Sequence, residues 1–138
     1  GRLVDGLGAR FTTSAGLAAV AAGCLLLTVL PPAAATAGYM AGLMLLTAGY
    51  ALFQAANNTA LLKGADPARR GLVSGLMNLA RNLGFIAGAA LMAAVYAAGV
   101  RYGHYPADLA SSHGMRVTFG LAAGMVMMAF LLSRRAGR

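Results

Sequence analysis

Acidic residues are scarce in this sequence: Asp and Glu total 3 of 138 residues, and all charged residues together make up 10%. A typical soluble domain carries about 25% charged residues, so this chain cannot cover a water-facing surface with polar groups. The three acids, Asp5, Asp66 and Asp108, all lie outside the apolar runs. The sequence also lacks a Ser-His-Asp set, a phosphate-binding loop and an HExxH motif, and we expect no enzymatic activity.

Cysteine and histidine are too few to build a redox or metal site. The single cysteine, Cys24, lies inside an apolar run, so neither an internal disulfide nor a CxxC site can form. The two histidines, His104 and His113, share one polar segment, and a metal site needs more ligands than this pair supplies. We therefore expect no metal and no cofactor.

Long hydrophobic runs dominate what is present: 59% of the residues are hydrophobic and the mean hydropathy is +0.71. Crossing a bilayer takes about 20 mostly apolar residues, and helices satisfy their own backbone groups there. We predict an all-α polytopic membrane protein with transmembrane helices at residues 11–30, 36–62, 71–100 and 114–132. The connecting segments are then residues 1–10, 63–70, 101–113 and 133–138.

The basic residues lie at the ends of the apolar runs and give a formal net charge of +8. Of the 11 Lys and Arg, Arg101 and Arg116 fall on one side, Arg81 lies within a run, and all the others fall on the opposite side. The positive-inside rule makes that richer side cytoplasmic. We expect a multi-pass protein of the cell (inner) membrane, with both termini and the 63–70 loop cytoplasmic and the 101–113 loop extracytoplasmic. Because the charges are not interleaved with aromatic residues, nucleic acid is not an expected partner.

The first ten residues carry a motif whose matching positions are Gly1, Leu3, Asp5, Gly8 and Arg10. It resembles the G-x-L-x-D-r-x-G-r-k motif of the major facilitator superfamily, although Gly6 and Ala9 replace two expected basic residues. In that family a second, degenerate copy lies in the cytoplasmic loop between helices 8 and 9, where it acts in gating. The resemblance implies that the four runs are the last four helices of a transporter with twelve or fourteen helices.

The 63–70 loop and the start of the next run resemble drug:proton antiporters, through Asp66-Pro67, Arg69 to Gly71 and Ser74 to Leu76. This resemblance implies proton-driven efflux of small amphipathic compounds. Uptake of a metabolite, and a small four-helix membrane subunit that binds a partner, remain the alternatives. The expected partners are membrane lipids, the remaining helices of the parent transporter and a small-molecule substrate.

The resemblance also implies that the helix over residues 36–62 lines the translocation path. Its large apolar side chains are the candidates for touching a substrate, with helix packing or lipid contact as the alternative for each: Tyr39, Met40, Leu43, Met44 and Phe53.

Polar residues at helical spacing mark the cytoplasmic ends of the second and third runs. Gln54, Asn57 and Asn58 follow i, i+3, i+4 on one run, and Asn78, Arg81 and Asn82 follow i, i+3, i+4 on the next. Arg81 has two interpretations. It extends to the cytoplasmic interface, or it faces the bundle interior with its amide neighbours, where it lines the cytoplasmic vestibule or pairs with a group on a helix of the parent transporter outside this sequence. No carboxylate lies in any run, so a proton-coupling group is expected elsewhere in the parent protein.

Glycines at GxxxG spacing, in the pairs 38/42, 71/75, 84/88 and 120/124, predict close packing between helices of this chain, with a dimer contact as the alternative.

Topology is testable with single cysteines in a Cys24→Ala background. We expect Ala65→Cys, in the 63–70 loop, to resist a membrane-impermeant maleimide in intact cells, and Gly103→Cys, in the 101–113 loop, to react. In inside-out vesicles the two reactivities should exchange. Labelling of Ala65→Cys from outside the cell would contradict the assigned orientation.

Overall fold

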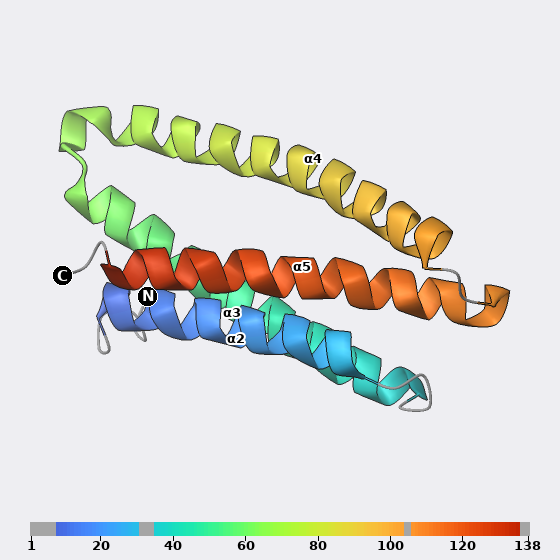
Figure 1. The fold of residues 1–138 in the computed structure, drawn as a ribbon. Helices are drawn as coiled ribbons and strands as arrows, with labels where there is room; N and C mark the ends of the chain where they lie inside the picture. The colour runs from blue at the N-terminus through green and yellow to red at the C-terminus, as the bar shows by residue number, and fades with distance from the viewer. Residues whose placement is uncertain (1–7, 31–34, 104–105, 136–138) are drawn as a thin grey trace.

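The computed structural model describes residues 8–30, 35–103 and 106–135, and this part of the chain is helical without a strand (Figure 1). Four long helices follow in order, joined in one place by a short 3-10 turn. They are α2 (Ala9–Val29), α3 (Ala35–Gly64), η2 (Pro67–Arg69), α4 (Arg70–Tyr102) and α5 (Ala107–Arg135). Each long helix contains a stretch long and apolar enough to cross a membrane. The predicted all-α fold with four membrane-length helices is confirmed.

Helix ends differ most from the sequence-based ranges around residues 101–113. We predicted a loop there, but α4 continues to Tyr102 and α5 already begins at Ala107. The cause is Pro106: its carbonyl oxygen accepts hydrogen bonds from the amides of Leu109 and Ala110, at 2.9 and 3.0 Å. Proline cannot continue a preceding helix but starts a new one well, so the polar residues that follow become the first turns of α5.

The turn between α3 and α4 is held by Asp66. Its side-chain Oδ1 accepts a hydrogen bond from the amide of Ala68 at 3.1 Å, and Pro67 occupies the first position of η2. A carboxylate cap followed by proline is a strong start signal for a helical turn. The chain therefore reverses direction within a few residues and brings the end of α3 close to the start of α4.

Helix α2 lies in the centre of the packing, between α3 and α5 (Figure 1). Its contact with α3 is very close: a Cβ added at Gly16 would lie 2.5 Å from the backbone nitrogen of Phe53, and one added at Gly49 would lie 2.8 Å from Ala19 Cβ. Small residues let helix backbones approach in lipid, where van der Waals packing replaces the hydrophobic effect as the main attraction. The core is correspondingly small and includes Leu17, Ala21, Cys24, Leu27, Ala56 and Ala123.

Helix α4 stands apart from the other three over much of its length (Figure 1). It packs on α5 near its C-terminal end, where a Cβ at Gly99 would lie 3.0 Å from Gly114 Cα, and none of its residues is buried. Its long apolar side chains are exposed, with Leu72 at 65% and Ile86 at 69%.

The GxxxG spacing predicts close packing within this chain at only some of its glycines. A Cβ at Gly71, Gly75, Gly84 or Gly88 would meet nothing within 4 Å. Gly42 is the exception, because a Cβ there would lie 2.7 Å from Leu27 Cδ2, and the other close contacts, such as those at Gly16 and Gly49, use glycines outside the GxxxG pairs. GxxxG specifies one stripe of a helix and not the direction in which that stripe faces.

Two variants distinguish a glycine that lies in a helix contact from a glycine that faces open space. We expect Gly16→Ala to destabilise the complete protein, because its methyl group meets the α3 backbone and overpacking costs about 1–3 kcal/mol. Gly75→Ala meets open space and gains up to about 1 kcal/mol of helix propensity. Unfolding in mixed micelles, followed by circular dichroism as SDS is raised, measures both. Equal stability of the two variants would contradict the α2–α3 contact.

Candidate functional site

A cluster of polar side chains bridges α3 and α4 near their shared turn. Arg81 of α4 donates from Nη2 to Asn58 Oδ1 on α3 and from Nη1 to Asn78 Oδ1 on its own helix, each at 3.4 Å. In the amide orientation that gives both polar ends a partner, Gln54 accepts from Nη1 and Nη2 of Arg81 at 3.1 Å, and its amide nitrogen donates to Tyr50 Oη at 2.9 Å. The guanidinium thus joins two helices that otherwise touch little.

Helical spacing explains why these residues meet. Tyr50, Gln54 and Asn58 follow i, i+4, i+8 on α3, so they lie above one another on a single face. On α4, Phe85 lies one turn beyond Arg81, and its ring packs against Tyr50 with centroids 6.3 Å apart and a tilt of 53°. Aromatic pairs prefer such tilted arrangements. The cluster therefore has two parts: the Tyr50–Phe85 ring pair, and the amide side chains that surround the guanidinium.

The electrostatics of the cluster are unusual because Arg81 contacts amides instead of a carboxylate. An arginine in the middle of a membrane helix costs about 2.5–3.5 kcal/mol, and hydrogen bonds to Gln54, Asn58 and Asn78 reduce that cost by replacing water. Asp66 is the one acidic residue among the described side chains, and its Oδ1 accepts a hydrogen bond from the amide of Ala68. Within the described part of the chain, the positive charge of Arg81 is thus hydrogen-bonded but has no acidic partner.

The structure brings together some of the predicted polar residues and separates others. Gln54, Asn78 and Arg81 share the cluster, whereas Asn57 and Asn82 make no hydrogen bond to Arg81, and Asn82 is exposed. Sequence reasoning had grouped Asn58 with the α3 stripe without selecting it as a path residue, and it overlooked Tyr50. The i, i+4, i+8 spacing back from Asn58 is the signal that finds Tyr50.

Arg81 follows neither sequence interpretation in full. It is half-buried and pairs with a helix of this same chain, namely α3. Lining of a translocation path by these residues stays a prediction.

The apolar path candidates on α3 divide by exposure. Met40 and Met44 are exposed, at 52% and 69%, whereas Tyr39, Leu43 and Phe53 are half-buried. Phe53 lies against α2, since its backbone is the group that faces Gly16. Met40 and Met44 thus present flexible side chains away from the contacts made within this chain, and Phe53 contributes to helix packing.

The N-terminal motif is only partly visible. Gly1, Leu3 and Asp5 lie outside the described residues, and of Arg10 only the backbone in α2 is described. Gly8 precedes α2 with φ of 80°, a conformation that favours glycine, and its carbonyl oxygen accepts from both the amide and the hydroxyl of Thr12. The positive φ therefore explains why glycine occupies this position of the motif.

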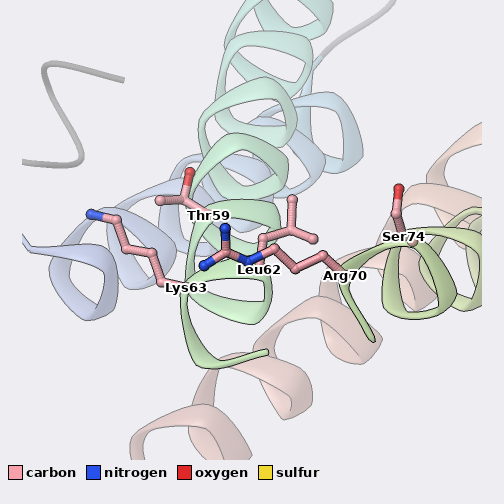
Figure 2. Close-up of a pocket in the computed structure, with 6 residues that line it drawn as sticks. Thr59, Leu62, Lys63, Arg70 and Ser74 are labelled. Atoms are coloured by element: carbon pink, nitrogen blue, oxygen red, sulfur yellow. The ribbon is translucent and has the colours of Figure 1, made fainter. Parts of the chain in front are cut away.

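A cavity of about 610 Å³ opens beside the cluster, between the end of α3 and the start of α4. Figure 2 shows the side chain of Arg70 extending from α4 toward α3. The cavity is lined by Thr59, Leu62, Lys63, Arg70, Gly71 and Ser74. No group of His, Cys, Asp and Glu side chains in the described residues is suited to hold a metal ion.

Comparison with known proteins connects this chain to membrane transport. It is 37% identical over 93 residues to the uncharacterized transporter YebQ of Escherichia coli (strain K12), a match that covers 67% of this chain and 20% of YebQ. The chain is a multi-pass membrane protein similar to part of a transporter. It spans about a fifth of the length of that curated relative. No protein-family model and no solved structure matches it.

A double-mutant cycle tests the bridge between α3 and α4. We expect Arg81→Met and Gln54→Leu to be coupled by about 0.6–1.7 kcal/mol, the range for interhelical polar contacts in membranes. Asn57→Leu is the matched control on the same helix, and it should be additive with Arg81→Met. SDS-induced unfolding of the complete protein supplies the free energies, and equal coupling of Gln54 and Asn57 to Arg81 would contradict the observed contacts.

Proposed function

We propose that this chain forms part of a secondary active transporter of the major facilitator superfamily, which exports small amphipathic compounds in exchange for protons. The observation that carries the proposal is the 37% identity over 93 residues to a transporter. The four membrane-length helices and the motif at Gly1, Leu3, Asp5, Gly8 and Arg10 support the superfamily. In this proposal the helices correspond to the last four of the fold, with both ends of the chain in the cytoplasm.

The packing supports a moving part within the chain. Alternating access requires one group of helices to move against another around a central site. Helices α2 and α3 are locked by backbone contact at glycines. Helix α4 packs on α5 near Gly99 and meets α3 through the Arg81 cluster, and many of its other apolar side chains are exposed. Polar side-chain bridges can break and re-form without repacking a core, so the α3–α4 pair is suited to open and close.

The exposed part of α3 supports an amphipathic substrate. Met40 and Met44 are large, flexible and uncovered by this chain, and methionine adapts to ligands of varied shape. Because the apolar runs contain no carboxylate, the proton-coupling residue of the proposal lies on a helix outside these residues.

Transport of a cationic amphipathic dye tests this function. We expect inside-out vesicles carrying the complete protein to accumulate ethidium when respiration acidifies their interior, and a protonophore to abolish the accumulation. Arg81→Gln should lower the initial rate about tenfold, which corresponds to about 1.4 kcal/mol. Arg135→Gln, which removes the same charge from an exposed position in the last turn of α5, should leave the rate unchanged.

Three outcomes would contradict the proposal. Accumulation that requires ATP and not the proton gradient would exclude secondary transport. Movement of a metabolite into intact cells, without efflux of the dye, would favour uptake. A stably folded protein that moves neither, and instead co-purifies with one partner in fixed stoichiometry, would favour the partner-binding subunit.

A further inference from the structure

We propose that the cavity at the α3–α4 turn binds the phosphate group of an anionic phospholipid, with Arg70 as its principal ligand. Arg70 and Lys63 line this cavity from the two helices, and Ser74 adds a hydroxyl group. The proposal requires only that the helices lie in a membrane, so it does not depend on what the protein transports.

The charge of the cavity selects an anion. Lys63 lies in the last turn of α3 and Arg70 begins α4, and both basic residues line this one cavity. The acid of this turn, Asp66, is not among the lining residues, and its Oδ1 bonds to Ala68. The lining therefore contains positive charge without a carboxylate.

The donor groups suit a phosphate in particular. A guanidinium offers a planar fork of N–H groups that matches two phosphate oxygens, whereas an ammonium acts as a point charge. The hydroxyl of Thr59 already donates to the carbonyl of Ala55 at 2.8 Å, whereas the hydroxyl of Ser74 makes no such hydrogen bond to the described residues. Ser74 is thus the hydroxyl able to donate to a bound anion.

The position and size of the cavity favour a lipid over free phosphate. It lies where two apolar helices end, which is the level of the headgroups, and basic pockets between helices there hold anionic lipids. Its volume of about 610 Å³ exceeds the needs of a phosphate ion and has room for a glycerol backbone. Leu62 lines it and offers apolar surface to an acyl chain.

Gly71 provides a way to close the cavity without changing its charge. It is a lining residue, and a Cβ at this position would meet nothing within 4 Å, so a larger side chain would extend into open space and not into another helix. A bulky substitution should therefore obstruct the lipid and leave the helices in place.

Native mass spectrometry of the complete protein in neutral detergent, titrated with phosphatidylglycerol, tests the proposal. We expect Arg70→Gln and Gly71→Leu each to weaken phosphatidylglycerol binding about tenfold. Arg69→Gln is the matched control, because it removes the neighbouring charge from the same turn outside the lining; it should change the affinity less than about twofold. Phosphatidylcholine of identical acyl chains should bind at least about tenfold more weakly than phosphatidylglycerol in wild type, since its choline would face Lys63 and Arg70.

Each remaining outcome would overturn the assignment. Equal losses in Arg69→Gln and Arg70→Gln would show a diffuse surface charge effect instead of a site. Unchanged binding in Gly71→Leu would place the lipid elsewhere. Displacement of phosphatidylglycerol by inorganic phosphate at equal concentration would identify a soluble anion as the ligand, and equal binding of the two lipids would remove the role of net charge.

Discussion

The absence of water from the bilayer interior is the constraint on which the rest of this structure depends. Every backbone polar group within it must find a partner in the protein, and a helix meets that requirement within one segment. The same rule acts on side chains: the hydroxyls of Thr28, Thr47 and Thr118 each donate to the carbonyl four residues earlier at 2.8 Å. Arg81 obeys it in turn, by spreading its donors over three amide side chains.

Two kinds of helix contact follow from this constraint. They make some helix pairs of the chain more rigidly joined than others. Helices α2 and α3 meet backbone to backbone, with no room for a methyl group at Gly16 or Gly49. Helix α4 instead reaches α3 through long side chains, in the Arg81 bridge and the Tyr50–Phe85 pair. A glycine contact is lost only by repacking whole helices, whereas a side-chain bridge can be exchanged bond by bond. The proposed transport motion and the proposed lipid site both lie at the more loosely joined pair.

Part of the polar cluster could be predicted from spacing alone, because residues three and four apart share a helix face. This placed Gln54 among the polar residues of α3, and Asn78 and Arg81 together on α4. It could not decide which edge of each stripe meets the other helix. Asn57 and Asn82 lie on the same stripes but bond to nothing in the cluster, and Tyr50 was overlooked because a tyrosine in an apolar run resembles a core residue. The rotation of each helix about its own axis determines which side chains of a stripe face the other helix.

What the sequence determined by itself was the number and kind of the long elements. Runs of apolar residues longer than a bilayer is thick, separated by prolines and basic turns, permit little besides membrane-length helices. Only the tertiary structure decided which helices touch. It packed α2 on α3 at Gly16, Gly49 and Gly42 but left the GxxxG glycines of α4 without close contacts, and it started α5 at Ala107. The physical reason is that hydropathy is nearly uniform around these helices, so it carries no direction, and shape complementarity between particular faces selects the neighbours.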